Sequence, residues 1–192
     1  RQRLRAVGDV AFDLPDTVEV QNRHHWIDAN VATFRRVMAP LADLPDGTYG
    51  PLADLSRTAN TGTMAALLAV LGRHVLGQYD PLLLGDDPDH ALYFVHPNIV
   101  GAADYLDVEY PRFRRWIAFH EVAHAAEFGA APWLSEYLEA RVEQGIGALA
   151  DGDLDREAFA DLDTAMTAVE GYAELLMDRA FDAEYADLRR KL

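Results

Sequence analysis

The sequence has 192 residues, half of them hydrophobic, and its 32 acidic and 17 basic residues give a net charge of −15. This length predicts a single domain that spans residues 1–192 around one sizeable core. Because cysteine is absent, disulfides, thiolate zinc ligands and iron–sulfur clusters are excluded, and any metal must be held by His, Asp or Glu.

The strongly acidic surface disfavours nucleic acid and anionic membranes as partners. We expect no transmembrane helix, since no run of about 18 apolar residues occurs. The N-terminal "RQRLRAVGDVAFDLPD" lacks the apolar stretch of a signal peptide, which predicts a cytoplasmic location. The acidity fits a high-salt cytoplasm, where screening removes self-repulsion. The codon bias of a GC-rich genome is the alternative, but it does not by itself demand so large a charge.

Two helical patterns occupy the first half of the chain. In "DANVATFRRVM" at residues 28–38, Asp28 is a candidate N-cap and the pattern stops before Pro40. At residues 61–77, apolar side chains form one helical stripe, and Gly77 follows as a candidate C-cap.

The second half begins with "HALYFVHP" at residues 90–97, whose aromatic and β-branched composition predicts a strand. Three longer helices follow, at about residues 111–128, 134–149 and 154–181. The first of them has Pro111 in its first turn and Gly129 after its expected end. The predicted fold class is therefore mainly α with a small β-sheet (α+β).

The sequence "WIAFHEVAHAAEFG" contains His120, Glu121 and His124 in the spacing His-Glu-x-x-His. On a helix the two histidines lie on one face, one turn apart, and can bind one zinc ion through their ring nitrogens. Glu121 projects to the side of the pair, where it can act as a general base on the attacking water without being a ligand.

Chance produces this spacing about once in a hundred chains of such composition, and paired histidines can also be solvated or packed. Here the pair shares its face with apolar side chains that include Trp116 and Ile117. Two buried neutral histidines need partners, and one metal ion satisfies both. The sequence therefore favours a metal site.

A catalytic zinc needs a third protein ligand. Glu127 is excluded, because it lies about 10.5 Å along the helix from His120. The best candidate is Glu170, which lies at the edge of an apolar stripe in residues 164–181. The alternatives for Glu170 are a boundary residue with its carboxylate in water or a partner of arginine. Glu174, one turn further, is a weaker candidate for a hydrogen bond to a ligating histidine.

Four segments together resemble a known family: "TMAALLAVLGRHVLGQYDPLL", "LYFVHPNIV", "FRRWIAFHEVAHAAEFGAAPWL" and "AVEGYAELLMD". The sequence is similar to the zincin-like metallopeptidase family that is often labelled coenzyme F(420) biosynthesis-associated. The resemblance runs from about residue 28 to the end. It implies a zincin-like metallopeptidase fold with the His-Glu-x-x-His motif on a central helix.

The resemblance also implies that zinc is held by His120, His124 and Glu170, with Glu121 as the catalytic base. Members of the family commonly have Gln where this chain has Glu127. They usually extend past the equivalent of Leu192, so relative to the family a C-terminal segment is expected to be missing.

The predicted function is a zinc-dependent metallohydrolase, first of all a peptidase, whose partner is a peptide or small amide substrate. The strand at 91–96 is expected to hold an extended peptide by backbone pairing. Candidate oxyanion donors are Tyr93, Tyr105, Tyr110 and Tyr172. Two alternatives stay open. One is a zinc-stabilised accessory or scaffold protein linked to coenzyme F(420) metabolism. The other is an enzyme that hydrolyses a small-molecule amide such as a glutamylated coenzyme.

Overall fold

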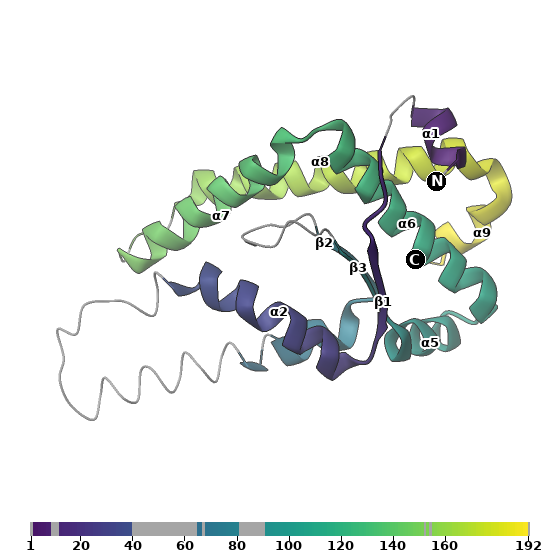
Figure 1. Cartoon of the computed structure of the whole chain (residues 1–192), viewed down its shortest axis with the longest axis horizontal. Coiled ribbons are helices and arrows are strands. Elements are labelled where there is room, and N and C mark those ends of the chain that lie inside the picture. The colour runs from purple at the N-terminus through teal and green to yellow at the C-terminus, as the bar shows by residue number, and fades with distance from the viewer. Residues whose placement is uncertain are drawn as a thin grey trace.

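Long helices surround a small sheet in the computed structural model (Figure 1). The structure describes residues 2–8, 12–39, 65–66, 68–80, 91–151, 153 and 155–191. The mainly α fold with a small β-sheet that the sequence predicts is confirmed. Within these described residues, none of the helices combines the length and the apolar character that a membrane span requires.

The sheet has three strands, β1 (Thr17–Gln21), β3 (Ala91–Val95) and β2 (Gly77–Asp80), in the order β1-β3-β2. β1 runs parallel to β3, whereas β2 is antiparallel to it. The predicted strand at 90–97 is confirmed as β3. Because both edges of β3 are already paired, the expectation that this strand binds an extended substrate is wrong.

Helix α2 (Arg23–Val37) confirms the helix expected at 28–38 but begins five residues earlier. Its N-cap is Asn22, whose side-chain oxygen accepts the His25 backbone N–H at 3.0 Å, so the predicted cap at Asp28 is wrong. The first turn contains a single apolar residue, Trp26, which is buried, so the amphipathic pattern does not reveal where the helix begins.

The helix expected at 61–77 is present in residues 65–66 and 68–74, and its other positions up to residue 74 lie outside the described residues. Gly77 is the first residue of β2, so its predicted role as a C-cap is wrong. The carbonyls of Gly72 and Val75 instead accept hydrogen bonds from the buried Asn98 amide, at 2.9 and 2.7 Å. This amide fixes where the helix stops and β2 begins.

Asn98 lies on α5 (His96–Tyr105), a helix with Pro97 in its first turn that the sequence patterns did not predict. α6 (Tyr110–Ala130) follows after a short turn and crosses the centre of the molecule (Figure 1). Pro111 lies in the first turn of α6 as predicted. Gly129, however, lies inside this helix rather than beyond its end.

Two further long helices, α7 (Trp133–Ala150) and α8 (Arg156–Phe181), agree with the predicted ranges to within a few residues. α8 packs along α6 in the main core. Ala123 on α6 and Ala173 on α8 are fully buried there. Small side chains let two helix backbones approach closely, and this brings polar side chains of α8 next to those of α6.

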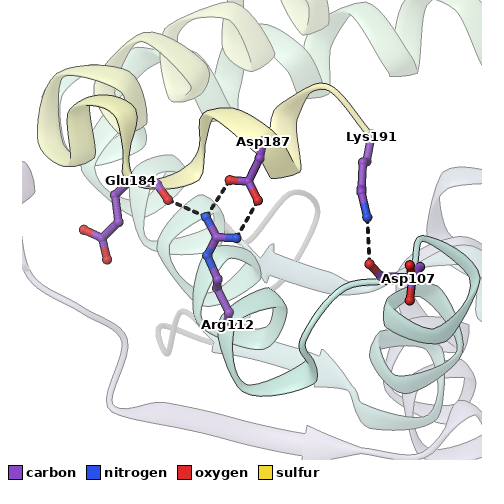
Figure 2. A network of polar contacts seen from close by, with 5 residues as sticks. All are labelled: Asp107, Arg112, Glu184, Asp187 and Lys191. Carbon is purple, nitrogen blue, oxygen red and sulfur yellow. Dashed lines mark hydrogen bonds and ion pairs between the residues drawn. The ribbon is translucent and has the colours of Figure 1, made fainter.

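The C-terminal residues fold back on the N-terminal end of α6 (Figure 2). After the 3-10 helix η1 (Asp182–Tyr185), α9 (Ala186–Arg189) carries Asp187 to within 2.6 Å of both terminal nitrogens of Arg112. Arg112 also donates to the Glu184 carbonyl. Lys191 donates to the carbonyls of Leu106 and Asp107 at 3.0 and 2.7 Å. We refer to these contacts as the C-terminal anchor.

Candidate metal centre

Two histidines of α6 direct ring nitrogens at one another. The Nε2 atoms of His120 and His124 are 3.2 Å apart, and the two rings are nearly perpendicular, with an interplanar angle of 83°. The i, i+4 spacing on a helix produces this approach, as the sequence predicts. His124 is buried and His120 is partly buried, so both side chains are withdrawn from bulk water.

Glu170 on α8 completes a group of three. Its Oε2 lies 3.5 Å from His120 Nε2 and its Oε1 lies 3.7 Å from His124 Nε2. One ligand atom from each residue falls within 4.8 Å of the others. The structure thus brings together the three residues that the sequence nominates as metal ligands.

The spacing of these atoms fits a zinc ion. Zinc binds nitrogen and oxygen at about 2.0–2.2 Å, so two ligands of a tetrahedral site lie about 3.3–3.6 Å apart. The two Nε2 atoms are 3.2 Å apart, and each lies near that distance from a different oxygen of Glu170, at 3.5 and 3.7 Å. Two histidines and one carboxylate are also a zinc ligand set that leaves one position for water. The residues present therefore fit the metal that the sequence implies.

Solvent reaches the group from the side of α8, because the Glu170 side chain is 53% exposed. Among the described residues, the group contains no fourth His, Asp or Glu. A pocket of about 330 Å³, lined by His120, Glu174 and Arg190 among others, opens on one side of it. A larger apolar groove of about 570 Å³ is lined by Glu127 of α6 and by Trp133, Tyr172 and other residues of α7 and α8.

Glu121 lies beneath β2, where its Oε2 accepts the backbone N–H of Tyr79 at 2.9 Å. The side chain is 6% exposed, and in the metal-free protein this burial raises the pKa of the Glu121 carboxyl to about 7. The nearby His124 and the Tyr79 N–H oppose the rise. A bound divalent cation would favour the ionised carboxylate.

Gly77 makes room for this carboxylate. A Cβ at residue 77 would lie 2.5 Å from Glu121 Oε1 and 2.6 Å from Glu121 Cγ, closer than any side chain tolerates. The backbone of β2 can approach the motif helix because residue 77 has no side chain. The motif in the sequence could not reveal this contact, since Gly77 lies 44 residues away from Glu121.

The outer edge of β2 faces Glu121. The Val95 N–H donates to the Leu76 carbonyl, so in the alternating antiparallel ladder Gly77 and Tyr79 turn their polar backbone groups away from β3. β2 is an edge strand, and no other described strand pairs with it on that side. The strand edge next to the site thus belongs to β2 and not, as the sequence suggested, to residues 91–96.

The two histidines differ in what supports them. The His120 ring stacks on Trp116, with ring centroids 5.6 Å apart and an interplanar angle of 15°. His124 has the buried carboxylate of Glu127 behind it, with Nδ1 and Oε2 3.5 Å apart. The sequence excludes Glu127 as a zinc ligand and does not predict this contact. Its i, i+3 spacing from His124 on an apolar face is the signal that could have identified this contact.

These surroundings shift the pKa values of the two histidines in opposite directions in the metal-free protein. Burial, followed by repulsion from His124, lowers the pKa of His120. Burial also lowers the pKa of His124, but its contact with Glu127 and the charges of Glu121 and Glu170 outweigh burial and raise it above the usual value. For Glu127, burial raises the carboxyl pKa despite the attraction of His124.

Other predicted residues lie apart from this group or stay untested. His96 Nδ1 contacts the Tyr110 hydroxyl at 3.0 Å, which explains both side chains structurally. Tyr105 is 89% exposed, whereas Tyr172 lines the apolar groove. Glu174 lines the pocket beside His120, and its role as a hydrogen-bond partner of a ligating histidine stays a prediction.

The structure is thus a mainly helical fold in which His120, His124 and Glu170 form a group that could hold a metal ion. A family model described as "zincin-like metallopeptidase" matches residues 1–154, which is most of the chain. The chain therefore belongs to the zincin-like metallopeptidase family. This membership supports zinc as the metal and hydrolysis as the class of reaction. Glu170 lies beyond the matched residues.

A solved structure extends the comparison to nearly the whole chain. It is the crystal structure of a candidate hydrolase with a novel fold from Chloroflexus aurantiacus, with a TM-score of 0.72 and 29% sequence identity. The alignment covers 93% of this chain and 56% of that one, so the present chain spans little more than half of its length. No curated protein matches the sequence. The coenzyme F(420) link stays a prediction.

Proposed function

We propose that this protein is a zinc-dependent hydrolase that cleaves peptide or amide bonds. His120, His124 and Glu170 would hold the zinc ion, and Glu121 would serve as the general base. The observation that carries this proposal is the grouping of His120, His124 and Glu170, whose ligand atoms lie within 4.8 Å of one another, with Glu170 open to solvent. Family membership supports the same class of reaction.

When bound, zinc would polarise the substrate carbonyl and make a water molecule more acidic. Glu121 would take the proton from the attacking water on its carboxylate and pass it to the leaving nitrogen. The Tyr79 N–H holds one oxygen of this carboxylate in place, which leaves the other for proton transfer. The burial of Glu121 keeps bulk water from competing for that proton.

The outer edge of β2 supports a peptide substrate over other amides. The Tyr79 N–H is already held by Glu121, so an extended peptide would pair with the polar groups that Gly77 turns away from β3, which would bring its backbone close to Glu121. The pocket beside His120 and the groove beside Glu127 would then accept groups on either side of the bond that is cleaved. Hydrolysis of a small-molecule amide remains the competing substrate class.

Metal analysis tests the proposal first. Elemental analysis of the purified wild type in high-salt buffer should give one zinc per chain, and Glu170→Ala should weaken binding strongly. The matched control is Glu136→Ala, which removes an exposed glutamate from α7 and should leave the zinc content unchanged. A wild type that takes up no zinc when zinc is offered would refute the metal site and the hydrolase together.

A substrate screen then separates the classes of function. Peptide libraries and small glutamyl amides are incubated with the zinc-loaded wild type and with Glu121→Gln, and products are read by mass spectrometry. Cleavage of peptides by the wild type alone supports a peptidase. Cleavage of glutamyl amides alone supports the small-molecule hydrolase, and zinc without any cleavage supports the accessory or scaffold protein.

A further inference from the structure

The two ring nitrogens of His124 face different surroundings. Nε2 points at His120 and Glu170, into the candidate zinc site. Nδ1 lies on the opposite side of the ring, 3.5 Å from the Oε2 atom of Glu127. The carboxylate is therefore behind the ring as seen from the metal site, and it cannot serve as a further ligand to the same ion.

Both atoms of this contact need a partner. His124 Nδ1 and Glu127 Oε2 are buried, and within the described part of the chain neither has another hydrogen-bond partner. Glu127 is only 7% exposed although it carries a carboxylate. A buried polar atom without a hydrogen bond destabilises the fold. A shift of a few tenths of an ångström would let these two atoms form a hydrogen bond with each other.

We propose that Glu127 is a positioning residue for His124. Its carboxylate accepts the Nδ1–H, which fixes the tautomer whose Nε2 lone pair faces zinc and holds the ring in the ligating orientation. This inference rests on the proposed function, because it assigns a role to Glu127 only if His124 binds metal. His120, one turn away on the same helix face, is held differently, by stacking on Trp116.

The proposal predicts that loss of the Glu127 carboxylate weakens zinc binding but does not lower the stability of the metal-free protein. Glu127→Leu removes the acceptor and should weaken zinc binding about 10- to 100-fold, the usual effect of losing such a partner. Its apo form should unfold at the same temperature as the wild type or higher, because a buried carboxylate is lost. Glu127→Gln keeps an acceptor oxygen and should retain most of the affinity. A residue that only packed would lower both quantities together.

The experiment measures zinc Kd by competition with a chromophoric chelator, alongside thermal unfolding of the apo proteins. Glu136→Gln on α7 is the matched control, because it removes the same charge from an exposed position. Cobalt substitution adds a spectroscopic readout: the visible bands of the Co²⁺-loaded Glu127→Leu variant should differ from those of the wild type, while the control should reproduce them.

The outcomes are distinct. A wild type that binds zinc together with a Glu127→Leu variant of equal Kd overturns the role of Glu127 alone. Glu127→Gln as weak as Glu127→Leu also overturns it. Absence of zinc in the wild type overturns the proposed function as well. If Glu127→Leu does not fold, ring ¹H–¹⁵N spectra of the zinc-loaded wild type decide: the Nδ1 proton of His124 is expected to be shifted downfield and protected from exchange by a hydrogen bond to Glu127, and a rapidly exchanging Nδ1 proton without this shift overturns the proposal.

Discussion

The polar side chains at the two ends of α6 differ in exposure and in hydrogen bonding. At the N-terminal end, Arg112 and Asp187 form the exposed C-terminal anchor, in which each charge has a close partner (Figure 2). Toward the other end, the histidines, Glu121 and Glu127 are withdrawn from water, and several of their atoms have no hydrogen bond. The same helix thus carries a surface network whose charges are paired and an interior group in which several polar atoms have no hydrogen bond.

The difference bears on where function lies. Exposed ion pairs contribute little to stability, because water and salt screen them. Buried polar atoms without partners destabilise the fold. Here the unsatisfied atoms are Nδ1 of both histidines and Oε2 of Glu127, which lie behind the Nε2 atoms that face the candidate metal site. The unsatisfied atoms around His124 therefore mark the candidate site more clearly than any count of charges does.

The largest effect is expected from Glu121→Gln. The substitution keeps the shape of the side chain and its ability to accept the Tyr79 N–H, but it removes the base. Hydrolysis should fall by about 10²- to 10⁴-fold, while the zinc content stays at the wild-type level. Assay of kcat and metal content on the same sample checks this. Full activity in the variant would assign the proton transfer to another group.

Gly77→Ala should act on the same carboxylate from the opposite side. The new Cβ would overlap Glu121, so the carboxylate must move, and a displacement of about 1 Å costs roughly a hundredfold in rate. Zinc should still bind. The control is Gly101→Ala on α5, where a Cβ meets nothing within 4 Å. It should leave activity unchanged and raise stability by about 0.5–1 kcal/mol, as alanine for glycine does in a helix.

Zinc itself should stabilise the fold through the interior network. At free zinc a hundred times its Kd, the free energy of unfolding should rise by about 2.7 kcal/mol if the unfolded chain does not bind the ion. Denaturant unfolding with and without chelator measures this difference. Glu170→Ala should lose most of the response, whereas Arg112→Gln, in the anchor, should keep it in full. A response that survives in Glu170→Ala would place the ion elsewhere.

The sequence predicts the long helices and the motif well because both depend on local spacing. The bodies of α6, α7 and α8 follow from apolar periodicity, and a four-residue spacing suffices to pair His120 with His124. Glu170 can also be predicted from local sequence, because a carboxylate at the edge of an apolar helical stripe is unusual unless it has a partner or a ligand. The roles of these residues as ligands stay predictions until metal is measured.

Contacts between distant segments were beyond such patterns. β1 and β2 are short, and although β1 alternates polar residues with Val18 and Val20, both valines are exposed, so neither strand has the apolar face that marks a strand in a sequence. A glycine after a helical stripe predicts a helix cap at Gly77, whereas the actual role of Gly77 depends on Glu121, which is distant in the sequence. The error at Asp28 has the same origin: several residues can cap a helix, and tertiary packing selects among them.

The smallest effect is expected from Arg112→Gln. It distinguishes the stability that comes from the Arg112–Asp187 pair from the effect of the net charge of the chain. Arg112 holds the pKa of Asp187 well below its usual range. The stability it adds is therefore present above the unfolded Asp pKa of about 3.9 and is lost as pH falls through the lower folded value. Because the pair is exposed, thermal unfolding at neutral pH and low salt should show only a small decrease in Tm.

In molar salt this decrease should vanish, because the screening length falls to about 3 Å. The same salt should raise the Tm of the wild type if repulsion within a chain of net charge −15 is the main electrostatic term. If salt removes the Tm difference between Arg112→Gln and the wild type and also raises the Tm of the wild type, the fold is adapted to high salt. A wild-type Tm that salt leaves unchanged would favour codon bias as the origin of the acidity.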